Sequence, residues 1–447
     1  MVEFSRLKQN MHQERISLMD NCTKKLLGLT DKNLIFEEDW LDTKQEAGIT
    51  TNIILAKLSY TPTYCRKCGI KNEGQIIKHG THNTTVQLLP FRSAKTELSL
   101  DRTRFLCKEC HSTFNAQTNL VEENCCISNE LKQQIALDLA KNISRKDIAE
   151  RYFVTDVTVT RVMRRCLESY KPNFKYLPSV LCFDEFKSMK SCSGKMSFVY
   201  MDGNTNKLIG VLENRKLAFL KAYFLKYSRK IRAKVKHIVM DMNAPYFELV
   251  KSVFPNAQIV TDRFHIVQQI SRAFNQLRIQ TMNKYHKTDS IKYKRLKRFW
   301  KLFLKNSYNL DSSNYRYNRS FRRPMTEKAI MDDLLSYNDQ LSAAYEICQL
   351  LLYHFKQKDT DSFFDTINSM DINLPEWFRK KLTFLNKYKQ GIQNAFETKY
   401  NNGALEGTNN KIKVIKRVAY GYRNFFNFRA RIYIMQGLIF TTKNKSS

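Results

Sequence analysis

The sequence predicts a multidomain α/β protein with a cysteine-rich module near its N-terminus. Three observations support this prediction. Two C-x-x-C pairs lie between residues 65 and 110, strand and helix patterns alternate from about residue 178 to 283, and long helical runs fill residues 284–398. A chain of 447 residues also exceeds the roughly 250–300 residues that a single hydrophobic core supports. Several domains are therefore expected.

The charge balance points to a polyanionic partner. The chain has 75 Lys and Arg residues against 42 Asp and Glu residues, a formal net charge of +33. Nucleic acid is the natural partner for such a surface. A membrane is the competing polyanion, but no run approaches the roughly 18 apolar residues of a spanning helix, and the N-terminus lacks an apolar signal region. A reducing cytosol is therefore expected.

Four of the eleven cysteines form two C-x-x-C pairs, Cys65, Cys68, Cys107 and Cys110. Each pair can place two thiolates on one side of a tetrahedral ion, and two pairs complete a structural Zn²⁺ site. We therefore predict a zinc-ribbon-like domain over residues 61–120, with an enlarged hairpin and one structural Zn²⁺. It follows an N-terminal platform of unknown role over residues 1–60. Four unrelated thiols are the other interpretation. Alternative ligands are His79, His82 and His111, but a closed four-thiolate site has no vacancy for them.

Residues 126–172 have a helical pattern that looks like a helix-turn-helix DNA-binding domain. Ala149 is small where two helices would cross, and Val159 and Val162 would face the core from the second helix. Phe153 departs from the pattern, because a glycine commonly eases this turn. The side chains left for phosphates and base edges are Thr155, Thr158, Arg161, Arg164 and Arg165. An ordinary helical hairpin is the alternative.

Residues 178–283 alternate between strand and helix patterns. Strands are predicted over residues 180–186, 195–212 (a hairpin turning at Asp202-Gly-Asn), 235–241 and 258–262, and helices over residues 216–227, 244–253 and from Phe264 onward. Three consecutive strands followed by alternating helices and strands predict a mixed sheet of the ribonuclease H kind. This segment is then the first part of a catalytic core, and residues 399–447 are its last part.

Residues 284–398 show long helical runs and no strand alternation, so we predict a large all-helical basic insertion. From Arg278 to Arg323 there are 14 Lys and Arg residues against only Asp289 and Asp311, interleaved with aromatic residues. One interpretation is a solvated basic helix whose apolar face lies in a core. The other, which the overall charge favours, is a face that follows DNA with its cations on phosphates.

Three acids are candidates for a catalytic metal site. Asp184 and Asp241 end buried strands that would lie side by side if those strands pair. Glu406 is the one acid among ten Lys and Arg residues between Thr398 and Ser447. Two Mg²⁺ (or Mn²⁺) ions held by carboxylates can stabilise both the attacking and the leaving oxygen of a phosphodiester. Taken singly, each acid could instead pair with a surplus base. The competing acids nearby are Glu185, Asp202 and Asp262.

The segment that begins Asn402-Gly-Ala-Leu-Glu-Gly-Thr-Asn-Asn-Lys-Ile-Lys, with Phe183-Asp-Glu-Phe, Met240-Asp-Met and Thr261-Asp-Arg-Phe-His, resembles insertion-sequence transposases of the ISL3 family. The resemblance covers nearly the whole chain. It implies that Asp184, Asp241 and Glu406 form a D-D-E triad that holds the two catalytic metal ions. It also implies that Asp262 and His265 belong to an auxiliary D-x-x-H element.

The resemblance implies a DNA transposase that binds terminal inverted repeats and catalyses metal-dependent strand cleavage and strand transfer. Its partner is double-stranded DNA, both transposon ends and target, with no membrane partner. A homodimer or higher oligomer would bring two ends together, in the bacterial cytoplasm and associated with the nucleoid. The basic residues expected to grip the DNA backbone after Glu406 are Lys411, Lys413, Lys416 and Arg417.

Three other functions compete with this hypothesis. A zinc-ribbon and helix-turn-helix regulator needs no catalysis, but it leaves residues 180–447 without a role. A nuclease of the same fold would cut DNA without joining it. A tyrosine-nucleophile recombinase would need an arginine-rich active site, and nothing in the sequence resembles one.

Overall fold

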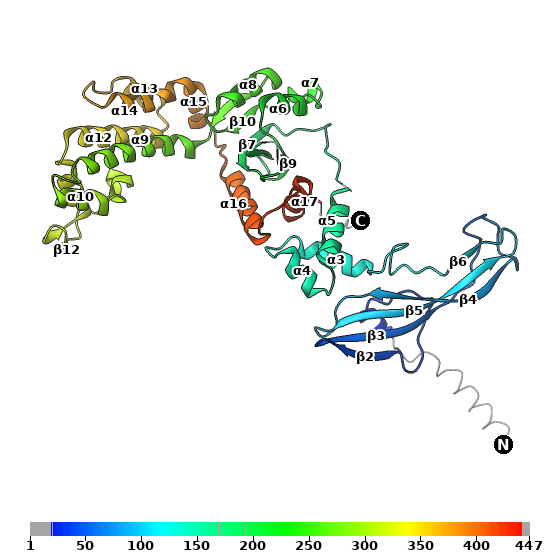
Figure 1. Cartoon of the computed structure of the whole chain (residues 1–447). Helices are drawn as coiled ribbons and strands as arrows, with labels where there is room; N and C mark the ends of the chain where they lie inside the picture. Colours follow the sequence, from blue (N-terminus) through cyan, green and yellow to red (C-terminus); the bar gives the residue numbers. More distant parts are fainter. Residues whose placement is uncertain (1–18, 20, 169, 193, 440–447) are drawn as a thin grey trace. The chain divides into compact units, whose positions relative to one another are not determined.

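The structure is a computed structural model that describes residues 19, 21–168, 170–192 and 194–439 (Figure 1). It divides into two compact units, residues 1–171 with 414–447, and residues 172–413. Among the described helices, none has both the length and the apolar composition that crossing a membrane requires.

The elements of the first unit are α2 (Asn21–Leu26), β1 (Leu34–Ile35), β2 (Leu41–Glu46), β3 (Ile49–Leu58), β4 (Ile76–Gln87), β5 (Lys95–Cys107), β6 (Thr113–Asn115), α3 (Asn129–Asp138), α4 (Arg145–Arg151), α5 (Asp156–Glu168) and α17 (Phe425–Met435). The core of the second unit contains β7 (Val180–Lys187), β8 (Met196–Asp202), β9 (Leu208–Leu212), α6 (Leu217–Phe224), α7 (Arg229–Arg232), β10 (His237–Met240), α8 (Ala244–Val253), β11 (Gln258–Thr261) and α9 (Arg263–Lys284).

The rest of the second unit is largely helical. It contains α10 (Ser290–Arg298), the 3-10 helices η1 (Leu302–Leu304), η2 (Ser307–Asn309) and η3 (Phe384–Tyr388), β12 (Arg316–Asn318), β13 (Arg323–Met325), α11 (Glu327–Leu335), α12 (Asp339–Gln357), α13 (Thr360–Asn368), α14 (Glu376–Thr383) and α15 (Lys389–Glu397). Helix α16 (Gly403–Val418) begins in the second unit and ends in the first.

A six-stranded sheet forms the N-terminal part of the first unit. β4 and β5 are the antiparallel hairpin predicted between the two cysteine pairs. β5 also pairs in parallel with β3, so the strands β1, β2 and β3 share one sheet with the zinc-ribbon-like region. Residues 1–18 and 20 of the predicted platform lie outside the described part of the chain.

The helices α3, α4 and α5 pack together with the predicted core residues between them. Ala149, Val159 and Val162 are all buried, as their positions in the sequence indicated. Helix α17 packs against α5, and Arg431 of α17 donates to the backbone carbonyls of Lys141 and Ile143, at 2.8 and 2.7 Å. The C-terminal segment from residue 414 therefore packs within the first unit. The sequence predicts this segment as the last part of the catalytic core.

The turn between α4 and α5 holds its backbone in an uncommon conformation. Phe153 has φ of +52°, in the left-handed region where a side chain costs roughly 1–2 kcal/mol and glycine is favoured. The amide of Gln87, from β4, donates to the carbonyls of Tyr152 and Phe153 at 2.7 and 3.0 Å. Phe153 thus stands where a glycine is common, and contacts with its neighbours hold it in this conformation.

A five-stranded mixed sheet organises the second unit, in the order β11-β10-β7-β8-β9. β7, β10 and β11 run parallel, and β8 and β9 are antiparallel to their neighbours. Helices α6 and α8 supply the apolar side chains that pack on one face, including Phe224 and Leu249 against Phe183 and Phe198. The predicted mixed sheet, with three consecutive strands before the alternating elements, is confirmed.

The parallel register aligns three acids. Cys182 of β7 pairs with Val239 of β10, and Met240 pairs with Thr261 of β11. Continuing this register places Asp184, Asp241 and Asp262 at matching levels, where β10 and β11 end and three residues before the end of β7. The predicted pairing of the strands that carry Asp184 and Asp241 is therefore confirmed.

Helix α15 packs against β11, close to these acids. The Asn394 side chain donates to the carbonyl of Ile259 at 2.7 Å, and Arg263 donates to the carbonyl of Ala395 at 2.8 Å. A Cβ added to Gly391 would meet the Thr261 Oγ1 at 2.5 Å, so only a glycine allows this close approach. Residues 389–397, predicted within the insertion, thus support the edge of the sheet.

The prediction of an all-helical insertion was wrong. β12 and β13 form an antiparallel hairpin between η2 and α11. The side chain of Asn318 accepts from the N–H of Ser320 at 3.0 Å, and Arg322 has φ of +55°, so the chain reverses without a glycine. Each strand is only three residues long, which is shorter than the roughly four to eight residues over which hydrophobic alternation reveals a strand.

We predict that Gly391→Ala destabilises the second unit by about 1–3 kcal/mol, because the new methyl group must displace the buried, β-branched Thr261. Gly407→Ala is the matched control, since it also adds a methyl group to a helix but meets no atom within 4 Å. It should leave stability unchanged or raise it by up to about 1 kcal/mol. Urea denaturation of both variants measures the difference, and equal effects would contradict the close packing of α15 on β11.

Candidate active site

A cleft of about 690 Å³ lies beside the ends of β7 and β10. Asp184 and Asp241 line it from the strands, His265 and Arg272 from α9, and Tyr388 from η3. The acids reach this edge because the register of the parallel strands aligns them, and α9 begins directly after Asp262. The cleft therefore collects carboxylates, an imidazole and a guanidinium from separate elements.

Asp241, Asp262 and His265 form the tightest cluster in the cleft region. His265 Nε2 lies 2.9 Å from Asp241 Oδ1 and 3.8 Å from Asp262 Oδ2. One ligand atom from each of the three residues lies within 4.8 Å of the others. Asp262 precedes the first turn of α9 and His265 lies within that turn, so the helix start turns the imidazole back toward the strand ends.

The electrostatics of the cluster reflect crowded negative charge. Burial raises the pKa of Asp184 to about 6, and the nearby charge of Asp241 acts in the same direction. Burial also raises the pKa of Asp262. The contact with Asp241 raises the pKa of His265, which favours the imidazolium form. A bound cation would relieve the same crowding.

Two asparagines of the α16 region contact the strand that carries Asp184. Asn409 Nδ2 donates to Asp184 Oδ2 at 2.6 Å and to the carbonyl of Glu185 at 3.3 Å. Asn402 Nδ2 donates to the carbonyl of Phe183 at 3.0 Å, and its backbone N–H to Asp262 Oδ1 at 3.4 Å. Both asparagines are buried.

These two asparagines are not among the site residues predicted from the sequence. Their signal was available in the spacing, because residues 402, 406 and 409 fall on one face of a helix. The Oδ1 atoms of Asn402 and Asn409 are buried and accept no hydrogen bond within the described residues. The site therefore contains two buried acceptor oxygens beside its acids.

Glu406 lies on this same face of α16, between the two asparagines in sequence. It is exposed, and it lies outside the cluster of Asp241, Asp262 and His265. Among the described residues it makes no hydrogen bond or ion pair with Asp184 or Asp241. The structure therefore brings Asp184 and Asp241 together in one cleft, and it puts Glu406 on the helix that is attached to Asp184.

The competing acids have structural partners. Glu185 accepts from the Tyr246 hydroxyl at 2.6 Å and from Asn243 Nδ2 at 3.1 Å, and it pairs with Arg215. Asp202 accepts from the backbone and hydroxyl of Thr205 in its turn. Glu185 and Asp184 thus have different partners although both line the cleft, and Asp202 serves the hairpin.

The donor set of the cleft suits a hard divalent cation. Mg²⁺ and Mn²⁺ prefer carboxylate and carbonyl oxygens. Asp184 and Asp241 offer carboxylates, and the asparagine Oδ1 atoms without donors are further oxygen acceptors. The residues present therefore fit such an ion.

The predicted cysteines form a second candidate metal site. The Sγ atoms of Cys65 and Cys110 lie 3.7 Å apart, and those of Cys68 and Cys107 lie 3.8 Å apart. A tetrahedral Zn²⁺ with Zn–S bonds of about 2.3 Å separates its sulfurs by about 3.8 Å. The backbone N–H of Cys68 lowers the pKa of the Cys65 thiol to about 6, and the N–H of Lys67 acts in the same direction. His79, His82 and His111 lie outside this cluster.

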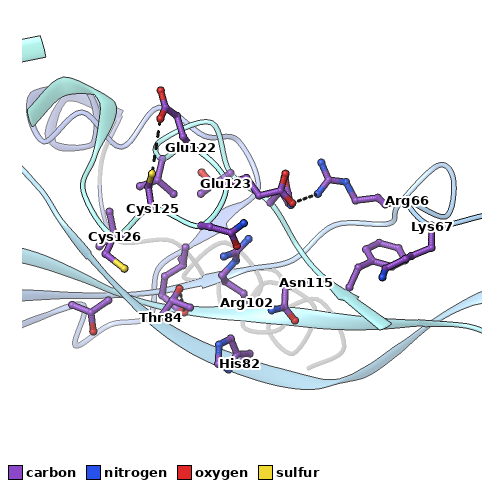
Figure 2. A pocket seen from close by; sticks show the side chains of 18 of the residues that line it. Arg66, Lys67, His82, Thr84, Arg102, Asn115, Glu122, Glu123, Cys125 and Cys126 are labelled. Atoms are coloured by element: carbon purple, nitrogen blue, oxygen red, sulfur yellow. Dashed lines mark hydrogen bonds and ion pairs between the residues drawn. The ribbon is translucent and has the colours of Figure 1, made fainter. Parts of the chain in front are cut away.

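A groove of about 840 Å³ beside the cysteine module is larger than the cleft but carries different chemistry. Figure 2 shows that its cations lie near acids, including the ion pair of Arg66 with Glu123, and that Arg102 lies among the lining side chains. Arg102 Nε donates to the carbonyl of Ala116 at 2.7 Å. The groove gathers no acid cluster suited to a catalytic metal, so the smaller cleft is the candidate active site.

The predicted DNA-binding residues differ in their surroundings. On α16, Lys411, Lys413 and Arg417 are exposed, whereas the Lys416 ammonium lies 5.7 Å from the centre of the Phe428 ring. Thr155 and Thr158 share a 3.0 Å hydrogen bond at the start of α5. Arg161, Arg164 and Arg165 are exposed, but Arg164 donates to Asn427 at 2.9 Å and Arg165 pairs with Glu122.

A sequence model of the ISL3 family, described as a transposase family, matches residues 181–432, more than half of the chain. The chain belongs to the ISL3 family of transposases. The match includes the cleft acids, the helical segment and α16 with Glu406, and it confirms the resemblance inferred from the motifs.

Two curated proteins are similar to this ISL3 family member. The transposase for insertion sequence element IS1001 from Bordetella parapertussis is 23% identical over 393 residues, which is 85% of this chain and 90% of that protein. A protein from Lactococcus lactis subsp. lactis called ATP-dependent protease is 42% identical over 113 residues, which is 25% of this chain. The chain covers 36% of the length of that second protein.

We predict that the full-length protein binds one Zn²⁺ through the four cysteines. Cys65→Ser should remove this zinc and unfold the N-terminal sheet. The buried Cys65 thiolate is one of the four ligands through which the ion would join the two C-x-x-C pairs. Zinc content by elemental analysis and the melting transition measure both effects. Cys348→Ser is the control, since this buried helical cysteine lies outside the cluster. Full zinc content in Cys65→Ser would contradict the assignment.

Proposed function

We propose that this ISL3 family transposase acts on the DNA of an insertion sequence, binding its terminal inverted repeats and catalysing strand cleavage and strand transfer. The observation that carries the proposal is the alignment of Asp184 of β7 with Asp241, which follows β10, across paired parallel strands, with Asn409 attaching α16 to Asp184. The strand order and directions support a ribonuclease H-like core for this sheet.

In this proposal Asp184, Asp241 and Glu406 hold two Mg²⁺ (or Mn²⁺) ions. When bound, the ions would activate water for cleavage and offset charge on the attacking and leaving oxygens of an in-line displacement. The oxygen-rich donor set and the crowded, buried carboxylates support this assignment. Glu406 belongs to it through the family motif and through its position on the same helical face as Asn402 and Asn409.

The protein's own residues orient these acids. Asn409 Nδ2 donates to Asp184 Oδ2, and the backbone N–H of Glu185 donates to Asp184 Oδ1 at 2.7 Å, so both carboxylate oxygens are held in fixed positions. His265 holds Asp241 from the first turn of α9, and Asp262 supports both His265 and Asn402, so we assign Asp262 and His265 an auxiliary positioning role. Lys411, Lys413 and Arg417 are exposed beyond Glu406 on α16, where they would bind the phosphate backbone.

The first unit supplies the proposed recognition of the repeats. Helices α4 and α5 would act as a helix-turn-helix, and the exposed side chain of Arg161 is available to DNA without a competing partner among the described residues. The zinc-bound cysteine module would support the same DNA. Two ends must meet for strand transfer, so we propose a homodimer or higher oligomer that works on the nucleoid.

A DNA-binding regulator without catalysis is the alternative, because the first unit alone could bind DNA. It would leave the acid cluster of the second unit without a purpose. Incubating the full-length protein with labelled DNA from both flanks of its gene, with Mg²⁺ or Mn²⁺, separates the two functions. Cleavage at the repeat boundary supports a transposase, and joined products exclude a nuclease that only cuts.

We predict that Glu406→Gln lowers end cleavage by roughly 100-fold or more, the scale of losing one group that stabilises transition-state charge. Binding to the same ends should stay within about twofold, because the amide keeps the size of the side chain. Glu397→Gln makes the same change at another exposed glutamate, on α15, and should leave cleavage unchanged. Retained cleavage in Glu406→Gln would sink the assignment of the third acid.

We also predict that Asn409→Ala lowers cleavage by about 10–100-fold and raises the Mn²⁺ concentration needed for half-maximal rate, since residues that orient metal ligands have effects of this size. Asn410→Ala is the matched control, because this neighbouring asparagine is exposed and contacts only Lys413 among the described residues. A rate loss in Asn409→Ala without a change in Mn²⁺ dependence would instead indicate a purely structural role.

A further inference from the structure

The β12–β13 hairpin, residues 314–325, is anchored at its turn. The Arg295 guanidinium, from α10, lies 3.9 Å from the centre of the Phe321 ring, and it donates to the carbonyl of Ser320 at 3.0 and 3.2 Å. Phe321 itself is buried. Figure 1 shows β12 beside α10 at the outer end of the helical segment. The hairpin is therefore a fixed projection rather than a loose loop.

The arginines around this hairpin fall into two groups. Arg295 and Arg323 have acidic partners in Asp333, and both help to hold the hairpin. Arg316 and Arg319 are exposed and have no hydrogen bond or ion pair among the described residues. No acid occurs in residues 312–326. Within the fold, Arg295 and Arg323 are thus paired with an acid, whereas Arg316 and Arg319 are available to bind an anion.

Two tyrosines on the hairpin are unusually exposed. Tyr315 is 68% exposed and Tyr317 is 67% exposed. Tyr317 lies in β12 and Tyr315 lies one residue before this strand, so two exposed rings occur close together on the hairpin. Neither ring contributes to a core, and neither has a partner among the described residues.

We propose that this hairpin binds DNA with unpaired bases, such as the strand freed at a cleaved transposon end. Arg316 and Arg319 would contact the phosphates, and Tyr315 and Tyr317 would stack on exposed bases. Bases inside a duplex are covered by their neighbours, whereas an unpaired strand offers its faces to aromatic side chains. The charge suits any DNA, and the exposed ring pair favours the unpaired strand. This inference rests on the proposed transposase function.

The test measures binding of the full-length protein to two labelled DNAs that share one duplex, one blunt and one with a short single-stranded tail. Wild type should prefer the tailed DNA, and a variant with Tyr315→Ala and Tyr317→Ala should lose that preference, by about 10–100-fold in affinity for the tail. Both tyrosines are exposed, so the variant should remain folded. Tyr315→Phe with Tyr317→Phe should keep the preference, because the ring face is retained.

A second variant tests the phosphate contacts. Arg316→Ala with Arg319→Ala should reduce the slope of log affinity against log salt concentration by about 1.4–1.8 on the tailed DNA, the value for two lost phosphate contacts. Tyr353→Ala, which changes an exposed tyrosine of α12, is the control and should match wild type in both assays.

The outcomes distinguish this inference from the proposed function. Equal affinity of wild type for blunt and tailed DNA, or an unchanged preference in the alanine variant, would overturn the inference even if wild type cleaves transposon ends. Tail binding lost in the tyrosine variant would support it even if no end cleavage occurs. Binding of the hairpin to an acidic protein but to neither DNA would also overturn it.

Discussion

The parallel register of β7, β10 and β11 is the constraint on which the candidate active site depends. It carries Asp184, Asp241 and Asp262 to matching levels at one edge of the sheet. Burial and shared negative charge raise the pKa of Asp184 to about 6, so the fold holds acids where ionisation is costly. Such an arrangement is unfavourable for stability alone and favourable for binding a cation. In the function proposed above for this transposase, the arrangement binds the catalytic metal ions.

Helix α16 links this edge of the sheet to the family motif. Asn402 and Asn409 make hydrogen bonds to the backbone and carboxylate of β7, and they leave buried acceptor oxygens nearby. A helical face carries both asparagines and Glu406, so attachment of the helix and orientation of the proposed third acid are coupled. The close packing of α15 on β11, which requires Gly391, supports the same edge from another direction.

The large positive charge of the chain is used in more than one way. Some cations are partnered within the fold, as Arg215 is with Glu185, and some lie over aromatic rings, as Lys416 does over Phe428. Others, such as Arg316 and Lys411, are exposed without an acidic partner among the described residues. Net charge indicates a polyanionic partner, but only the contacts of each side chain identify the cations that remain available to it.

The sequence by itself determined the cluster of four cysteines, the order of strands and helices in the second unit, and the acids in or directly after its buried strands. These features are local: C-x-x-C spacing, a change of hydrophobic period, and charge at the end of an apolar run can be read without a fold. The family motif around Glu406 was also visible in the sequence. The β12–β13 hairpin was missed, because its strands of three residues are too short to show the alternation of a strand.

Only the tertiary structure decided which distant groups meet. It joined β3 to the cysteine module, placed residues after 414 in the first unit, and gave Asn409 its contact with Asp184. It also drew Asp262 and His265 into contact with Asp241. The physical reason is that strand register and helix packing are set by contacts between residues far apart in the chain. A local sequence pattern does not specify which distant residues will be in contact.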